Sequence, residues 1–361
     1  MRFAFFGSSL VSAYWNGAAT YYRGLLKALA SRGHQIAFYE PDAFDRQAHR
    51  DIDDPDWARV VVFPADAAGM DRALADAARA EVVVKFSGVG ALDRELEAAV
   101  AALRRPGRLA IFWDVDAPAT LERVNEDSSD AFLPLVPQYD AVLTYGGGEA
   151  VVDGYMALGA RLCVPIYNAL DPDTHFPAAP DPRFQGDLGC LGNGLPDREA
   201  RVERFFLDAA ARLPGRRFVL GGSGWETKPM PGNVAYVGHV YTRDHNAFNG
   251  SSLAVLNVNR DSMARFGASP PTRIFEAAGA GACIITDAWT GIDRFLEPGT
   301  EILTAESGEE VAAHLEALDR TRAAEIGRAA LERVHASHTY AHRAAEVEGL
   351  LEGWDALRVA V

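Results

Sequence analysis

The segment that most constrains the fold runs from Ser269 to Asp287, where a short helical stretch passes directly into a short apolar one. The two prolines near its start interrupt the preceding structure, and a proline is tolerated in the first turn of a helix. We predict a helix over 272–280, ended by glycine, and a buried strand over 282–286. A helix leading into a buried strand is the repeating unit of an open parallel α/β sheet. The ligands of such sheets bind beyond the carboxyl ends of the strands.

The same alternation of apolar runs and helical patterns continues along the chain. The first strand, helix and strand are expected at 2–6, 18–32 and 35–40, which makes a βαβ unit. Further strands are expected at 59–63, 81–86, 108–113, 139–144, 162–168, 217–221, 253–260 and 301–304, and a glycine-rich strand and turn at 186–193. Strands this apolar, with helices between them, predict parallel sheets covered on both faces. With 361 residues, and with four prolines crowded into 172–182, the chain is expected to form two domains.

The composition of the chain argues against several classes of protein. The chain has 35 basic and 50 acidic side chains, a net charge of −15, and this balance argues against a nucleic-acid partner. Cys163, Cys190 and Cys283 are scattered without the spacing of a zinc site, so a reducing compartment is expected. The apolar start of the chain is too short for a signal peptide, and no apolar stretch is long enough to span a membrane. We therefore expect a cytoplasmic protein without a transmembrane segment.

Arg273 and Glu276 are one helical turn apart, so they share a face of the helix expected at 272–280. A carboxylate in this position could accept hydrogen bonds from both hydroxyls of a ribose, and a guanidinium could clamp a diphosphate. The alternative is an ordinary salt bridge on a solvated face. The spacing alone favours that salt bridge.

A glycine-rich turn is expected at 222–224, directly after the apolar run 217–221. Gly222 and Gly224 would leave the backbone N–H groups around Ser223 open to a diphosphate. Lys228 follows closely and could pair with a phosphate, although exposed lysines are just as common on an ordinary surface. As a lone glycine turn, this segment is a weak signal.

Asp114 and Asp116 follow the strand expected at 108–113, at the end where α/β proteins place their chemistry. Either carboxylate could contact an acceptor hydroxyl or act as a base. Either could equally cap the helix that begins near Pro118. Three histidines near the C-terminus, His335, His338 and His342, lack the glutamate of a zinc motif and are interpreted as structural.

Two stretches carry a resemblance to a known family. Residues 273–281, Arg-Ile-Phe-Glu-Ala-Ala-Gly-Ala-Gly, followed by Ile-Ile-Thr-Asp, resemble the donor-binding segment of GT-B glycosyltransferases, in particular the branch related to the spore-maturation protein CgeB. Residues 168–177 are similar to the crossing between the two halves of GT-B proteins. The resemblance implies two Rossmann-like, doubly wound domains facing a cleft. It places the acceptor side at 1–168, the donor side at 169–335, and at 336–361 a helix that packs back on the first domain.

The resemblance also implies a function: transfer of a sugar from a nucleotide-diphosphate-sugar to an unknown acceptor, which could be a small molecule, a glycan or a protein. No metal and no cofactor are expected, and retention of anomeric configuration is expected. Glu276 would hold the ribose. The other donor-binding candidates are Gly222, Ser223, Gly224, Lys228, Asn257 and Arg273. The catalytic candidates are Asp114 and Arg260, and the acceptor-side loop would contain Ser8, Asn16 and Gly17.

The chain departs from the family pattern at one position. Many retaining GT-B enzymes have a second glutamate eight positions before the ribose-binding one, and here that position is Ala268. Two alternatives therefore stay open: a nucleotide- or sugar-binding protein without transfer activity, and an epimerase that acts on the nucleotide-sugar itself. The base, the sugar and the acceptor are not specified by the sequence.

Overall fold

The protein is described by a computed structural model that covers residues 1–14, 16–194 and 196–359. It divides into two compact units. The first contains Met1–Tyr167 and the segment from Tyr340 onward, and the second is Asn168–Thr339. The predicted boundaries, 168/169 and 335/336, lie close to these divisions. The second division comes later than predicted because helix α12 (Arg320–Ser337) continues past residue 335.

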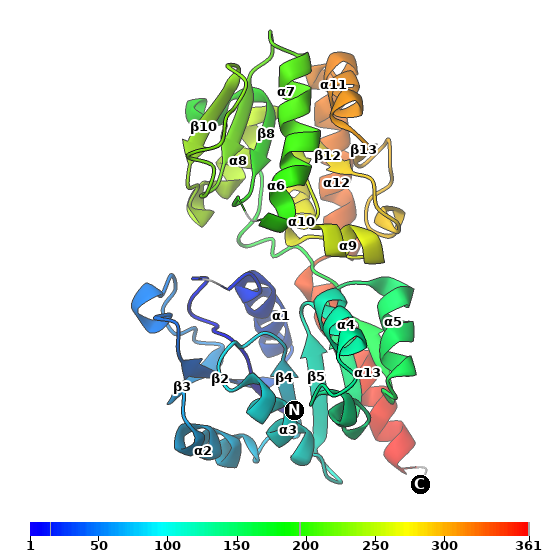
Figure 1. Cartoon of the computed structure of the whole chain (residues 1–361). Helices are drawn as coiled ribbons and strands as arrows, with labels where there is room; N and C mark the ends of the chain where they lie inside the picture. Colours follow the sequence, from blue (N-terminus) through cyan, green and yellow to red (C-terminus); the bar gives the residue numbers. More distant parts are fainter. Residues whose placement is uncertain (15, 195, 360–361) are drawn as a thin grey trace. The chain divides into compact units, whose positions relative to one another are not determined.

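The first unit is built on a seven-stranded parallel sheet with the order β3-β2-β1-β4-β5-β6-β7 (Figure 1). Its strands are β1 (Arg2–Phe6), β2 (Gln35–Asp42), β3 (Ala58–Pro64), β4 (Val82–Phe86), β5 (Leu109–Asp114), β6 (Ala141–Thr144) and β7 (Cys163–Pro165). Its helices are α1 (Ala19–Ser31), α2 (Ala67–Ala77), α3 (Asp93–Ala102), α4 (Ala117–Glu126), α5 (Gly148–Ala157) and α13 (Tyr340–Val359). Central strands such as β4 and β5 are buried at every residue, as expected for a sheet covered on both faces.

Helix α13 returns to the first unit and packs on α1. The rings of Tyr340 and Tyr21 lie 6.0 Å apart in an edge-to-face arrangement. At the other end of the contact, Glu348 pairs with Arg32 and with His34, whose Nε2 lies 2.8 Å from the carboxylate. The closing helix therefore belongs to the first unit although the chain reaches it from the second.

The second unit contains a six-stranded parallel sheet with the order β10-β9-β8-β11-β12-β13. The strands are β8 (Gly186–Leu191), β9 (Phe218–Gly221), β10 (Val234–Gly238), β11 (Ser252–Asn257), β12 (Ile284–Asp287) and β13 (Leu303–Ala305). The α-helices are α6 (Pro196–Val202), α7 (Asp208–Arg212), α8 (His245–Ser251), α9 (Asp261–Phe266), α10 (Thr272–Gly279), α11 (Gly308–Ala317) and α12, and a π-helical turn, Glu203–Leu207, joins α6 to α7.

The two parallel, doubly wound sheets confirm the predicted α/β fold class. The order of strands reverses between β1 and β4 in the first sheet and between β8 and β11 in the second. Ligands of such sheets bind outside the carboxyl ends of the strands at this reversal. We therefore expect a ligand site of the second unit at the loops after β8 and β11 and at the start of α10.

Some local predictions hold and one fails. Ser307 caps α11 by accepting a hydrogen bond from the Glu310 backbone N–H at 3.2 Å, as its capping sequence predicts. For residues 261–268 the sequence predicts a loop, but the segment begins with α9, which has Asp261 in its first turn. This prediction was wrong because a six-residue helix is too short to carry a readable apolar period. In the described part of the chain, no helix is both long and apolar enough to span a bilayer.

Candidate functional site

Helix α10 runs against the direction of the strands, so its first turn lies at the carboxyl end of the second sheet. Its start is held by Asn168, whose Nδ2 donates to the Pro270 carbonyl at 3.1 Å. At Gly279 a Cβ would lie 2.3 Å from Leu170 Cδ1 and 3.0 Å from the His175 carbonyl oxygen. The missing side chain therefore lets the segment 170–175 pack directly against α10, which brings His175 beside this helix.

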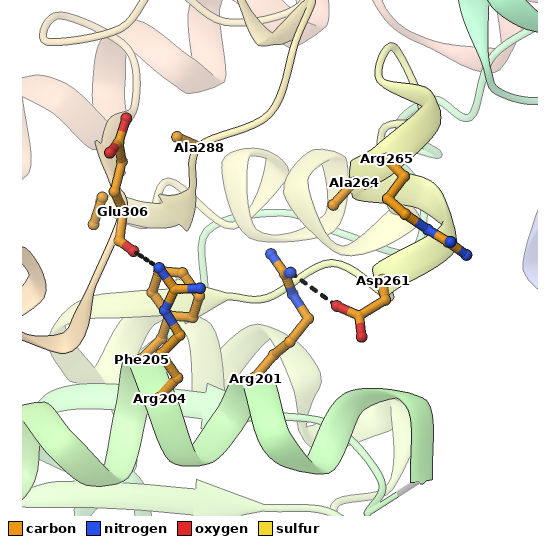
Figure 2. A pocket seen from close by; sticks show the side chains of 9 residues that line it. Arg201, Arg204, Phe205, Asp261, Ala264, Arg265, Ala288 and Glu306 are labelled. Atoms are coloured by element: carbon orange, nitrogen blue, oxygen red, sulfur yellow. Dashed lines mark hydrogen bonds and ion pairs between the residues drawn. The ribbon is translucent and has the colours of Figure 1, made fainter.

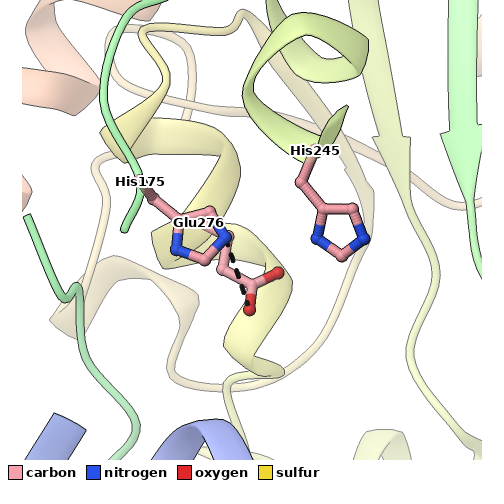
Figure 3. A group of neighbouring side chains, drawn as sticks. All are labelled: His175, His245 and Glu276. Carbon is pink, nitrogen blue, oxygen red and sulfur yellow. Dashed lines mark ion pairs between the residues drawn. The ribbon is translucent and has the colours of Figure 1, made fainter. Parts of the chain in front are cut away.

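Glu276 on α10 meets two histidines that are far from it in the sequence (Figure 3). His175 comes from the segment that enters the second unit, and His245 begins α8. One nitrogen of each histidine and one carboxylate oxygen all lie within 4.8 Å of one another. His175 is 3% exposed, and its Nε2 lies 3.9 Å from Glu276 Oε1. Sequence reasoning missed both histidines because no spacing links three such distant positions.

Arg273 completes this group from the first turn of α10. Its Nη1 is buried without a hydrogen-bond partner among the described residues. The salt bridge with Glu276 that the spacing favours does not form among the ion pairs that the structure describes, and Glu276 Oε1 instead lies 3.9 Å from His175 Nε2. Burial lowers the pKa of His245, and Arg273 and His175 lower it further, while the Glu276 charge opposes them. The four side chains therefore lie within electrostatic reach of one another.

Arg198, in α6, is a second arginine at the carboxyl end of this sheet, and sequence reasoning missed it. A Cβ at Gly192, directly after β8, would lie 3.1 Å from its Nη1. Burial raises the pKa of the Cys190 thiol to about 11, and the charges of Arg273 and Arg198 oppose this rise. Two guanidinium groups thus approach the end of β8. An arginine placed just after a glycine turn that follows a buried strand was the signal available in the sequence.

The sequence was compared with models of known protein families, and one family model covers most of the residues of this site. Residues 198–349 match the family model described as glycosyl transferase-like, and this range contains Arg198, His245, Arg273 and Glu276. The matched domain makes the protein a glycosyltransferase. Its fold is GT-B. The narrower likeness to the CgeB branch stays a prediction.

Solved structures of the same fold cover nearly the whole glycosyltransferase. A sucrose-phosphate synthase from Thermosynechococcus elongatus is 13% identical, with a TM-score of 0.71, over 99% of this chain and 100% of its own. HepE from Anabaena, in complex with UDP and glucose, is 13% identical, with a TM-score of 0.66, over 98% and 100%. An α-glucosyltransferase in complex with UDP is 11% identical, with a TM-score of 0.71, over 98% and 100%. No curated protein matches the chain by sequence.

The glycine turn Gly222–Gly224 of the glycosyltransferase is closed by hydrogen bonds within the protein. Its three N–H groups donate, in chain order, to Gly238 O (2.8 Å), Asn193 Oδ1 (3.0 Å) and Glu226 Oε1 (3.3 Å). Gly222 has φ +123°, and a Cβ there would lie 2.2 Å from the Gly192 carbonyl oxygen. The glycines are thus required by the close approach of the neighbouring loop. The protein itself uses these three donors here, and the phosphate loop at Gly222, Ser223 and Gly224 stays a prediction.

Lys228 is also engaged by the protein. Its ammonium forms ion pairs with both Glu199 and Glu203, one helical turn apart along α6 and the turn that follows it. Two carboxylates already neutralise this charge, and the role of Lys228 as a phosphate partner stays a prediction. These ion pairs link the segment after β9 to α6 and to the turn that follows it.

Asn257 and Arg260 lie at and beyond the end of β11. Asn257 is 3% exposed, and its Nδ2 donates to Thr286 Oγ1 at 2.9 Å, which links β11 to β12. Its amide therefore serves the sheet, against the prediction of a donor contact. Arg260 is partly exposed at the position that precedes α9, and its catalytic role stays a prediction.

Asp114 ends β5 and has no exposed surface. Its carboxylate accepts hydrogen bonds from Ser87 Oγ at 2.7 Å, from the Asp116 backbone N–H at 2.9 Å and from the Tyr155 hydroxyl. Asp116 provides no side-chain cap to α4. In this conformation the carboxylate is fully buried and has three donors, and its catalytic role stays a prediction. The carboxylate ties β5 to β4 and α5.

The acceptor-side loop after β1 is closed by its own side chains. Ser8 Oγ donates to Asn16 Oδ1 at 2.9 Å, and Asn16 Nδ2 donates to the carbonyl oxygens of Ser9 and Ser12. Ser8 and Asn16 are 2% and 8% exposed, so both side chains shape the loop instead of facing a ligand. Gly17 is exposed, with open space where a Cβ would be, and its predicted contact with the acceptor stays a prediction.

A separate cavity of about 600 Å³ opens beyond the ends of β12 and β13 (Figure 2). Its charged lining comes from Arg201, Arg204, Asp261, Arg265 and Glu306. Arg201 donates to Asp261 at 2.9 Å and to the buried Asp287 at 2.5 Å, and Arg204 donates to the Glu306 carbonyl at 2.7 Å. Arg201 and Arg204 are thus bonded within the protein, although Arg201 Nε is buried without a hydrogen-bond partner among the described residues.

Proposed function

We propose that this glycosyltransferase moves a sugar from a nucleoside diphosphate sugar, held by its second unit, to an acceptor. The observation that carries the proposal is the buried Arg273 Nη1, which has no hydrogen-bond partner among the described residues and lies one turn from Glu276 on the same helix. A buried, unpaired guanidinium nitrogen is costly unless a ligand pairs with it. A diphosphate is the ligand group that fits a guanidinium fork at the carboxyl end of a parallel sheet.

Each residue of the group has a part in the proposed complex. The Glu276 carboxylate accepts hydrogen bonds from the ribose hydroxyls, and Arg273 pairs with the diphosphate. Arg198 lies near the same end of β8 and adds a second positive charge. As the glycosidic bond to the diphosphate breaks, negative charge develops on the leaving oxygen, and the two guanidinium groups stabilise it.

Two finer features belong to the proposal. The first is that transfer needs no bound metal, because the two arginines supply the positive charge that stabilises the leaving group. The second is that the anomeric configuration of the sugar is retained, as the family resemblance implies. Uridine is the first base to test, because HepE and the α-glucosyltransferase were both solved with UDP. Arg260 is proposed as a catalytic residue, and Gly17 as part of the acceptor-side loop.

The deciding experiment measures nucleotide binding and turnover separately. The melting temperature is recorded with UDP, UDP-glucose, GDP, ADP and dTDP, since a ligand at a hundred times its Kd stabilises by about 2.7 kcal/mol. Donor turnover is then followed by release of nucleoside diphosphate. Binding with release supports transfer. Binding without release indicates a binding protein, and a changed sugar on an intact nucleotide indicates an epimerase. If none of the nucleotides shifts the melting temperature, the proposal is wrong.

A further inference from the structure

The group around Glu276 has a property that nucleotide binding does not use. Thr174 Oγ1 donates its single proton to the Asp171 carbonyl at 3.1 Å, and it lies 2.9 Å from His175 Nδ1. The contact with Thr174 holds the His175 ring in place. The other ring nitrogen, Nε2, faces Glu276, from which it is separated by 3.9 Å.

His245 is also held by a second contact. One of its ring nitrogens forms a hydrogen bond with the Val240 backbone. One nitrogen of each histidine and one oxygen of Glu276 lie within 4.8 Å of one another. Two imidazoles and a carboxylate thus converge, and His175 Nε2 is buried without a hydrogen-bond partner among the described residues.

We propose that His175, His245 and Glu276 form a binding site for a divalent cation of the zinc class, and that this cation and the donor ribose compete for Glu276. Two imidazoles and a carboxylate, each imidazole oriented by a second hydrogen bond, are a donor set that suits zinc. Calcium and magnesium prefer oxygen ligands throughout. The competition rests on the proposed function, whereas the cation site itself does not.

The geometry needs only small side-chain movements. Ligand atoms about 2.1 Å from a tetrahedral zinc are about 3.4 Å apart, compared with 3.9 Å between His175 and Glu276 here. Rotation of the Glu276 carboxylate and of the partly exposed His245 ring closes the remaining gap. The charge of Arg273 opposes a second cation nearby, so the site is expected to bind zinc reversibly. Zinc then acts as an inhibitor that occupies the carboxylate needed by the ribose.

The experiment begins with the full chain stripped by a chelator and titrated with Co²⁺ in the absence of nucleotide. One Co²⁺ per chain, with the visible absorption of a tetrahedral complex, is expected, and calorimetry with Zn²⁺ should give the same stoichiometry. His175→Ala and His245→Gln should each weaken binding by more than about tenfold, and Thr174→Val by about tenfold through loss of ring orientation. His335→Ala removes an exposed histidine of α12 and should change nothing.

The melting temperature of each variant shows that it is folded, and His245→Gln, at a partly exposed position, keeps the test valid if His175→Ala fails to fold. Absence of saturable Co²⁺ binding, or equal binding by the wild type and both histidine variants, would overturn the proposal. Adding UDP should raise the apparent Kd for Co²⁺ in proportion to UDP occupancy. If Co²⁺ binds but UDP has no such effect, the cation site stands, the competition is overturned, and Glu276 no longer belongs to the ribose site.

Discussion

The ammonium of Lys85, wholly buried on β4, lies 2.8 Å from Asp93 Oδ1 at the first turn of α3. The same carboxylate accepts hydrogen bonds from the Val89 and Gly90 backbone N–H groups at 3.1 and 2.6 Å. Burial alone would raise the pKa of Asp93, but the charge of Lys85 and these hydrogen bonds hold it below its usual value. One carboxylate therefore both neutralises a buried lysine and closes the loop between β4 and α3.

Asp93→Asn should destabilise the first unit by about 3 kcal/mol, because it leaves the Lys85 charge buried without its partner. The depressed pKa means that the ion pair stabilises fully above the pKa of an unfolded aspartate and is lost as the pH falls through the folded-state pKa. Urea unfolding of wild type and variant should thus differ at neutral pH and converge in acid. Asp71→Asn, on the exposed face of α2, is the control. Equal stability of Asp93→Asn and wild type at neutral pH would contradict this role.

Glu276→Gln should weaken binding of a nucleoside diphosphate by about ten- to a hundredfold. The substitution keeps the shape but removes the charge that strengthens the hydrogen bonds to the ribose. Affinity for UDP alone should fall as much as affinity for UDP-glucose, because both share the ribose. Calorimetry with each ligand measures this, with Glu325→Gln on α12 as an exposed control. A loss confined to the sugar donor would move the contact of Glu276 from the ribose to the sugar.

Lys228→Met should leave nucleotide affinity within about twofold of the wild type, since the ammonium already pairs with Glu199 and Glu203. Arg273→Met is the matched comparison, because it removes a guanidinium nitrogen without a partner among the described residues, and it should weaken UDP binding by more than about tenfold. Calorimetry with UDP ranks the two variants. The reverse order would identify Lys228 as the phosphate partner.

The arrangement of strands and helices was predictable because apolar runs and helical periods survive in a single sequence. The division near residue 168 was also readable, since prolines between 172 and 182 exclude regular structure there. The site was readable only in part. Arg273 and Glu276 share one helix, so their spacing brings them together. His175 and His245 join them only through tertiary packing, which depends on the close approach of residues 170–175 at Gly279.

Three of the site predictions rest on the same kind of sequence signal. Gly222–Gly224, Lys228 and Asp114 were identified by residue type at the end of a strand, where both ligands and protein groups need polar partners. Sequence does not reveal which polar groups the protein itself satisfies. Here Asn193, Glu199 and Tyr155 supply the missing partners from elsewhere in the chain.

Asp114 offers a direct test of this distinction between structural and catalytic carboxylates. Asp114→Asn replaces an acceptor by a group that must turn an N–H₂ toward Ser87 or Tyr155, so the first unit should lose about 1.5–3 kcal/mol of stability. Tyr155→Phe removes one of the same hydrogen bonds. The double variant should therefore lose less stability than the sum of the losses of the two single variants, by more than about 0.5 kcal/mol.

Below its melting temperature, Asp114→Asn should keep kcat within about tenfold of the wild type, because the side chain has no exposed surface. A fall in kcat of a hundredfold or more in the folded variant, with stability unchanged, would show that Asp114 reaches the substrate and is a catalytic residue.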